Sequence, residues 1–216
     1  MDRNERRYET DYSALMVAAH YDLGDIAETL LIHGADPNTK IYNDFENLQD
    51  NALAVAASLG HNEVFVILIG NGADITEAFH MAASKGQADI VADLLDRGVN
   101  INDQGDQGGY NKMTALMTAA MLGHKEVFDL LIEKGANMDL QCDDGNTALI
   151  YSLHNVYPGS KKTDSYFMTL LEHGADVGAK NSKGKTIIQN IYCRDDCEKY
   201  YHALVDHGAN INHKVR

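Results

Sequence analysis

Residues 114–137 read TALMTAAMLGHKEVFDLLIEKGAN, and this stretch decides the fold. A segment of small residues, ALMTAA at 115–120, is followed by a glycine and then by apolar residues at helical spacing, such as Val127 and Leu131. The stretch closes on Gly135, where the end of a helix needs a left-handed residue that glycine supplies without strain. The pattern predicts two short helices separated by a break and closed by a glycine.

The same pattern recurs six times along the chain. Successive closing glycines are 38, 26, 37, 39 and 34 residues apart, which scatters around a repeat of about 33 residues. A helix pair of this kind cannot bury its apolar side alone, so stacked neighbours must supply the core and the end repeats must act as caps. The six closing glycines are Gly34, Gly72, Gly98, Gly135, Gly174 and Gly208.

This pattern resembles the ankyrin repeat, in which a T-P-L-H-x-A-A segment, a glycine break, a second helix and a G-A-D or G-A-N ending follow one another. Thr114–Ala120 and Thr147–Leu149 match the first segment, and Gly123–Val127 matches the break. The sequence departs from the family where alanine replaces the proline in five repeats and Ile187 replaces it in the sixth. The histidine of the motif survives only as His80. Alanine is a strong helix former, so the loss of proline need not harm the helix.

The resemblance implies an all-α fold, an ankyrin-repeat α-solenoid of helix–turn–helix units with short β-hairpin fingers on the concave side. Residues 41–45 enlarge the first finger and residues 105–108 the third, whereas the finger between repeats two and three is nearly absent, since Ile75 runs almost straight into Glu77. An insertion at 155–163 lies between the helices of repeat five. Each irregularity is either functional or drift in a solvent loop, since such loops tolerate insertions at little cost in stability.

We expect a single repeat domain at 13–212, preceded by an N-terminal tail at 1–12 and followed by a C-terminal tail at 213–216. The six repeats of this domain lie at about 13–40, 46–75, 76–104, 109–141, 142–180 and 181–212.

The chain of 216 residues carries a formal net charge of −14, and this charge is unevenly distributed. Residues 1–108 contain 19 acidic and 6 basic side chains, whereas residues 109–216 contain 13 and 12. A surface this negative repels nucleic-acid phosphates and anionic lipids, so we expect neither nucleic acid nor a membrane as partner.

The sequence predicts no membrane-spanning segment and no signal peptide. The longest run of large apolar residues, Val64–Ile69, is too short to span a bilayer, and the first residues are charged. Three cysteines fit a cytoplasmic protein, either of the producing cell or of a host cytosol to which it is delivered.

Aligning the repeats places aromatic, methionine and acidic side chains on the fingers and on the ends of the first helices. Apolar anchors such as Phe45, Leu59 and Met121, ringed by charge, are typical of an interface core. The alternative for Phe45 and Tyr110 is that each packs back on its own finger. The expected partner-binding residues are Tyr21, Tyr42, Asp44, Phe45, Glu46, Leu48, Asp50, Leu59, Lys85, Asp106, Tyr110, Met113, Met121, Leu122, Asp143 and His154.

Four soft ligands near the end of the sequence have a spacing that a zinc site could use: Cys193, Cys197, His202 and His207. However, His207 occupies the same position before a closing glycine as the histidines of two earlier repeats, where a cation suits the helix dipole. We therefore expect no metal and no cofactor. A metal- or ligand-binding regulator that uses these four residues is the alternative function.

The residues of the chain do not predict an enzyme, because no Cys or Ser nucleophile can be placed beside a His with an orienting acid. His61 and His124 occupy matching repeat positions, which favours a shared structural hydrogen bond over catalysis. The expected function is a protein–protein interaction module, an adaptor or inhibitor, that binds a partner with a basic patch through its concave face and fingers. A bacterial immunity-type protein and a delivered effector both fit, and a structural segment of a larger complex is a third option. We expect a monomer.

Overall fold

The structure is a computed structural model, and it describes residues 12–43, 48–105, 112–153, 163–191 and 197–210. The contacts divide the chain into two compact units, Met1–Ala78 and Phe79–Arg216, which we call unit 1 and unit 2 and describe separately. The first helix of each repeat is called inner and the second outer. The longest helices that the structure describes have ten residues, and none of those described is long and apolar enough to cross a membrane.

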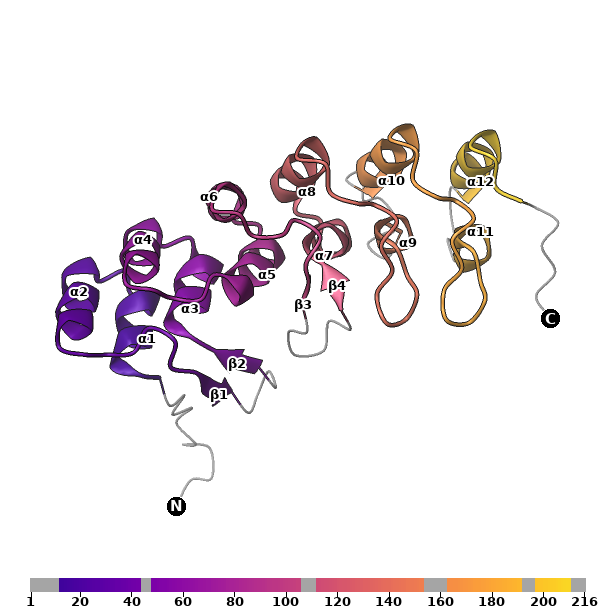
Figure 1. The fold of residues 1–216 in the computed structure, drawn as a ribbon. Coiled ribbons are helices and arrows are strands. Elements are labelled where there is room, and N and C mark those ends of the chain that lie inside the picture. The colour runs from indigo at the N-terminus through magenta and orange to yellow at the C-terminus, as the bar shows by residue number, and fades with distance from the viewer. Residues whose placement is uncertain (1–11, 44–47, 106–111, 154–162, 192–196, 211–216) are drawn as a thin grey trace, which may run out of the picture. The chain divides into compact units, whose positions relative to one another are not determined.

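Unit 1 contains two complete helix pairs and one β-hairpin (Figure 1). The inner helix α1 packs beside the inner helix α3, and the outer helix α2 packs beside α4. Strands β1 and β2 are antiparallel, with Tyr42 opposite Gln49. The elements are α1 (Ala14–His20), α2 (Gly24–Ile32), β1 (Ile41–Asn43), β2 (Leu48–Asp50), α3 (Ala52–Leu59), α4 (Asn62–Gly70) and α5 (Thr76–Lys85), of which α5 continues into unit 2.

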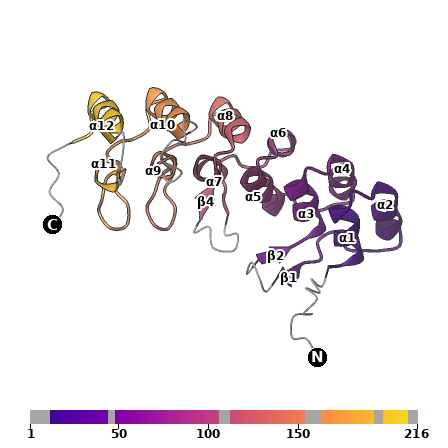
Figure 2. The ribbon, with the colours of Figure 1, turned by 180° about the vertical axis from the view of Figure 1, so that it is seen from behind.

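Unit 2 arranges its helices in two rows, with α7, α9 and α11 in the inner row and α8, α10 and α12 in the outer row (Figures 1 and 2). Strands β3 and β4 form a second antiparallel hairpin, in which Gly105 lies opposite Met113. The elements after α5 are α6 (Ala88–Asp96), β3 (Gln104–Gly105), β4 (Met113–Thr114), α7 (Ala115–Leu122), α8 (Lys125–Glu133), α9 (Ala148–Tyr151), α10 (Thr163–Glu172), α11 (Ile187–Asn190) and α12 (Cys197–Asp206).

Polar side chains start the inner helices. The hydroxyl of Ser13 accepts from the backbone N–H of Met16 at 3.2 Å, and the hydroxyl of Thr114 accepts from that of Met117 at the same distance. The amide oxygen of Asn51 accepts from the N–H of Ala54 at 2.8 Å. Each bond satisfies a donor that the first helical turn would leave unpaired. The family's proline is therefore dispensable here, because alanine follows a working N-cap.

Paired alanines allow the inner helices to pack closely. Ala18 and Ala19 in α1, like Ala56 and Ala57 in α3, are almost fully buried, as are the alanine pairs of α5 and α7. Because alanine has no side chain beyond Cβ, two neighbouring inner helices can approach along this stripe without leaving voids. In unit 1, α1 packs against α3 in this way.

The six closing glycines all adopt the left-handed conformation, with φ between +80° and +91°. At Gly72, the N–H of the next residue, Ala73, donates to the carbonyl of Leu68 at 3.1 Å. Every outer helix ends with the same hydrogen bond: the residue after the closing glycine donates its N–H to the carbonyl of the residue five positions before it. It satisfies a carbonyl at the helix end and requires a residue that tolerates positive φ. The predicted role of these glycines is confirmed.

The fingers follow the sequence irregularities. The first insertion lies at the β1–β2 hairpin and the third finger is the β3–β4 hairpin, as expected. Between α4 and α5 only residues 71–75 intervene, and these residues, all of them described, include no strand. The insertion at 155–163 falls between α9 and α10, but residues 154–162 lie outside the described part of the chain.

We predict that Gly72→Ala lowers the free energy of unfolding by about 1 kcal/mol, because a Cβ disfavours the left-handed backbone at this position. The matched control is Gly70→Ala, two residues earlier, where the backbone is helical; it should raise the free energy of unfolding by about 0.5 kcal/mol. An added Cβ meets no atom within 4 Å at either position, so steric crowding does not distinguish the two variants. Urea unfolding followed by circular dichroism measures both. Shifts of the same sign would contradict this account of the glycine.

Candidate protein-interaction surface

Two histidines connect a repeat to the repeat before it. His61, at the start of α4, hydrogen-bonds through Nδ1 to the carbonyl of Ala19 in α1 at 2.8 Å. His124, at the matching position before α8, hydrogen-bonds through Nε2 to the carbonyl of Ser84 in α5, also at 2.8 Å. Each ring satisfies a carbonyl near the end of an inner helix. The shared structural hydrogen bond expected for this pair is confirmed.

The last positions of the inner helices carry exposed apolar side chains in both units. In unit 1, Tyr21 directly follows α1 and is 67% exposed, and Leu59 ends α3 and is 41% exposed. In unit 2, Leu122 and Lys85 occupy the same repeat position and are exposed, while Met121 is half-buried. Because α1 packs beside α3, Tyr21 and Leu59 belong to neighbouring repeat positions on one side of unit 1. These are apolar side chains in reach of a partner.

Met113 is a correction to the expected surface. Its side chain is 4% exposed, so it packs in the core of unit 2 and cannot contact a partner. Met113 lies in strand β4 opposite Gly105 and directly precedes the N-cap Thr114. Met113 lies at the base of the finger, where its side chain is buried against the helices that the finger joins.

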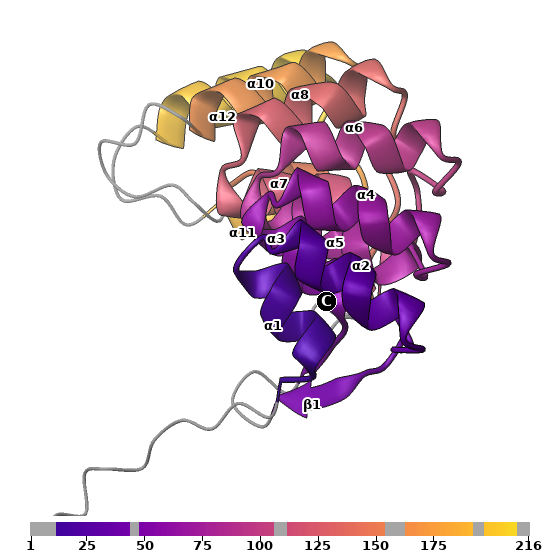
Figure 3. The same ribbon diagram turned by 90° about the vertical axis from the view of Figure 1, so that its left-hand side faces the viewer.

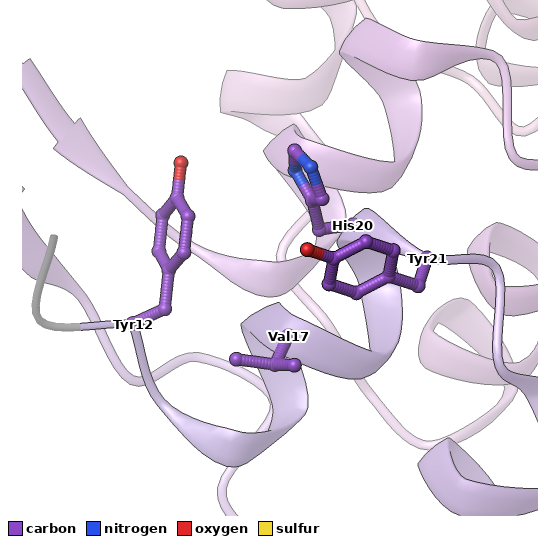
Figure 4. Close-up of a pocket in the computed structure, with 4 residues that line it drawn as sticks. All are labelled: Tyr12, Val17, His20 and Tyr21. Carbon is purple, nitrogen blue, oxygen red and sulfur yellow. The ribbon is translucent and has the colours of Figure 1, made fainter.

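A shallow hollow of about 470 Å³ lies beside α1, lined by Tyr12, Val17, His20 and Tyr21 (Figure 4). The ring of His20 contacts that of Tyr21 edge to face, with centroids 4.8 Å apart, and lies 6.1 Å from the ring of Tyr12. Tyr12 lies on one side of Val17, and the other two rings lie on the other side. Sequence reasoning missed Tyr12, which it assigned to the tail. It also missed Val17, whose equivalent Val55 is buried.

The sequence of unit 1 from residue 12 to residue 78 is strongly acidic. Residues 12–78 contain ten Asp and Glu residues and a single Lys or Arg, Lys40. Lys40 forms an ion pair with Glu77, whose other carboxylate oxygen accepts from the side-chain amide of Asn51 at 2.9 Å. The backbone N–H and the hydroxyl of Thr76 hold the pKa of Asp74 below its usual range, so this carboxylate stays ionised. The one basic side chain of this segment is thus already neutralised within the unit.

The acidic side chains of unit 2 are more often paired. Asp143, one of the expected contact residues, lies 3.6 Å from the ammonium of Lys112, and Lys134 lies 2.9 Å from Asp96. The sequence predicted that the first half of the chain would be more negative than the second half, which is nearly neutral. Most of the excess negative charge of the chain therefore lies in unit 1.

His80 holds the third finger in place. Its Nε2 lies 2.9 Å from a carboxylate oxygen of Asp103, and its ring is buried. Gly105 in β3 approaches so closely that a Cβ there would lie 2.6 Å from a ring atom. The histidine that the sequence retains from the family motif thus fixes the base of the finger.

Several expected contact residues cannot be placed. Asp44, Phe45, Glu46, Asp106, Tyr110 and His154 lie outside the described residues, and for Tyr42, Leu48 and Asp50 only the backbone is described. The finger tips therefore remain predictions from the sequence.

Of the four residues weighed as an alternative metal site, His207 makes a contact at a helix end. Nδ1 of His207 hydrogen-bonds to the carbonyl of Ala203 at 2.7 Å, and His33 and His173 make the same contact in their own repeats. His202 is exposed and lies 3.5 Å from Glu198. Cys193 and the side chain of Cys197 lie outside the described residues, and the described part of the chain holds no group of three or more metal-ligating side chains.

A buried thiol and a buried phenol meet in unit 2. Cys142 Sγ lies 3.3 Å from the hydroxyl of Tyr151, and both side chains are buried. Burial and the hydrogen bond with Cys142 raise the pKa of Tyr151 to about 12, so the phenol stays protonated at neutral pH. A protonated phenol closed off from solvent cannot serve as a base that activates the thiol. The pair is a core contact.

Comparison with known proteins agrees with this geometry. A family model described as ankyrin repeats (3 copies) matches residues 79–181, and an ankyrin repeat model matches residues 10–41. The chain belongs to the ankyrin-repeat family. The human ASB11 ankyrin repeat domain has a similar structure, with a TM-score of 0.72 and 22% identity over 94% of this chain and 87% of that one, which shows the fold.

Curated ankyrin-repeat relatives match part of the chain. An ankyrin repeat-containing protein of Treponema pallidum is 30% identical over 50% of this chain, and one of Schizosaccharomyces pombe is 27% identical over 58%. The matches cover 34% and 56% of those proteins. Human neurogenic locus notch homolog protein 2 is 32% identical over 61% of this chain and 5% of its own length. Ankyrin repeats are generally protein-interaction modules and are typically non-enzymatic.

We predict that the stability of unit 2 falls as the pH rises from about 10 to about 12. The pKa of Tyr151 is about 12 in the folded protein and about 10 when exposed. Its protonated form therefore stabilises the fold fully below pH 10, and this stabilisation is lost through that range. Tyr151→Phe should reduce the loss, whereas Tyr21→Phe, which removes an exposed hydroxyl, should not. Urea unfolding at a series of pH values measures this loss of stability. If Tyr151→Phe lost as much stability as the unsubstituted protein over this pH range, the loss would not come from Tyr151.

Proposed function

We propose that the chain is a non-enzymatic interaction module that acts as an adaptor or an inhibitor. It binds a protein partner carrying a basic patch, and it does so through the inner-helix ends and fingers of its repeats. The observation that carries the proposal is the pair of exposed apolar side chains, Tyr21 and Leu59, on a unit whose segment 12–78 has ten acids and one internally paired lysine.

The combination suits an interface for two physical reasons. Exposed aromatic and aliphatic side chains supply the hot spots of protein complexes, because their burial removes apolar surface from water. Unpaired carboxylates around them favour a positively charged partner and accelerate the encounter. The inner helices are fixed by N-caps and by the His61 bond, so ordering this surface on binding costs little conformational entropy.

The role follows from the absence of a described reactive site. A module of this kind acts by occupying a partner or by bringing two partners together. Inhibition of a bacterial toxin by an immunity-type protein and capture of a host protein by a delivered effector are both roles of this type, and both place the chain in a cytosol.

We predict that Leu59→Ala weakens binding to a partner isolated by affinity capture by about tenfold, because a central apolar contact is lost. The matched control is Val66→Ala, which removes a similarly exposed aliphatic side chain from the outer helix α4. It should leave the dissociation constant within about twofold. Calorimetric titration of purified chain and partner measures both variants.

The same titration at rising salt concentration tests the charge complementarity. Affinity should fall as salt screens the acidic unit, and reversal of the finger charges at Asp44, Glu46 and Asp50 should flatten this dependence. Equal losses in Leu59→Ala and Val66→Ala would contradict the inner-helix face as the binding surface. Affinity that does not change with salt would contradict the basic partner.

A further inference from the structure

One position in the outer helix is buried in every repeat except the first. This position lies eight residues before the closing glycine. In repeat 1 it is Ile26, which is 49% exposed, whereas its five equivalents are at most 3% exposed. The equivalents are Val64, Ile90, Val127, Tyr166 and Tyr200.

The next position along the helix shows the reverse pattern. Seven residues before the closing glycine, Tyr201 of repeat 6 is 40% exposed, whereas its five equivalents are at most 1% exposed. These equivalents are Ala27, Phe65, Val91, Phe128 and Phe167. The first repeat thus exposes the core position at minus eight, and the last repeat exposes the neighbouring core position at minus seven.

Ring contacts in unit 2 show that these two positions meet across repeats. Phe128 of repeat 4 contacts Tyr166 of repeat 5 edge to face, with ring centroids 4.8 Å apart. Phe167 of repeat 5 contacts Tyr200 of repeat 6 in the same way at 5.1 Å. The residue at minus seven in one repeat therefore packs on the residue at minus eight in the next. Ile26 and Tyr201 are the two halves of such a contact, and among the described residues neither has its counterpart.

The open side of repeat 1 carries further stacking residues. Leu23 and Val17 are both exposed. Leu23 occupies the position of His61 and His124, which reach back to the preceding repeat. We call Val17, Leu23 and Ile26 the head face; Figure 3 shows α1 and α2, which carry it, in front of α3 and α4.

The open side of repeat 6 lies on α12, which ends the outer row of unit 2 in Figures 1 and 2. Val205, one turn after Tyr201, is exposed as well, whereas its equivalents are half-buried in four repeats and buried in one, at Leu171. We call Tyr201 and Val205 the tail face. End repeats usually present a polar outer side to keep a solenoid soluble, whereas both faces here are apolar.

We propose that the head face of one copy stacks on the tail face of a second copy. In this contact Tyr201 of one copy covers Ile26 of the other, as Phe128 covers Tyr166 within the chain. The sequence led us to expect a monomer, and the exposed stacking positions favour association instead.

Charge favours this arrangement over a symmetric one. The segment 12–78 around the head face has ten acids and one lysine, so two heads repel each other. Repeat 6, residues 181–212, has four acidic and four basic residues, and Lys199 lies 4.9 Å from the centre of the Tyr200 ring beside the tail face. A tail-to-tail contact would pair Tyr201 with itself, which differs from the minus-seven to minus-eight pairing seen inside unit 2.

A head-to-tail contact is heterologous, so each added copy leaves one head and one tail open. The assembly should therefore grow with concentration and not stop at a dimer. One stacking contact must offset the lost translational and rotational freedom, so the association should be weak.

Two single variants test the pairing by complementation. Ile26→Glu blocks the head and leaves the tail, and Tyr201→Glu blocks the tail and leaves the head. Sedimentation velocity from about 10 to about 500 µM should show growth for the unsubstituted protein and at least about tenfold weaker association for each variant alone. An equimolar mixture of the two variants should form a 1:1 dimer that grows no further. Both side chains are exposed, so the helical circular dichroism should be unchanged.

The control is Val66→Glu, which places the same charge at an exposed apolar position outside both faces and should associate like the unsubstituted protein. A monomer at all concentrations overturns the proposal, as does a loss of association in Val66→Glu. A dimer of Ile26→Glu alone would indicate a tail-to-tail contact, and a dimer of Tyr201→Glu alone a head-to-head contact; either overturns it. If association appeared only after residues 1–11 were removed, the head face would be covered by that segment in the full chain, and this result would also overturn the proposal.

Discussion

The contact between the outer helices of successive repeats is the interaction on which the rest of this structure depends. A repeat of two short helices has too little apolar surface to form a core of its own, so each repeat must bury its apolar side against a neighbouring repeat. In unit 2 this burial is visible in the aromatic pairs that join α8 to α10 and α10 to α12. The left-handed glycines and the N-caps set the ends of the helices so that these pairs can meet.

The surface that we propose for binding is a consequence of the same constraint. The side of the inner helices that is not needed for stacking is free to vary, and in unit 1 it carries Tyr21 and Leu59 among acidic side chains. Because the stacked core holds the helices in place, these residues are presented on a scaffold that is already ordered. The protein can therefore change its partner preference at the inner-helix ends without losing its fold.

Features that depend on local backbone requirements could be predicted from the sequence. The closing glycines, the shared bonds of His61 and His124, and both hairpins follow from residue type at a fixed repeat position. The burial of Met113 could not be predicted, because the repeat period does not say which way a finger residue points. The exposure of Ile26 was missed for a related reason: the repeat period does not predict that a position buried in the other five repeats is exposed in the first. Val17 was missed in the same way, since its equivalents Val55, Thr118 and Tyr151 are buried.

Hydrogen exchange of unit 2 at low protein concentration tests most directly whether neighbour contacts supply the stability. The outer helix α8 packs against α6 and α10 within the unit, whereas among the described elements α12 packs against one outer helix, α10. The account predicts that the backbone amides of α8 exchange markedly more slowly than those of α12, because opening a repeat with two neighbours breaks more contacts. Equal protection of the two helices would contradict it.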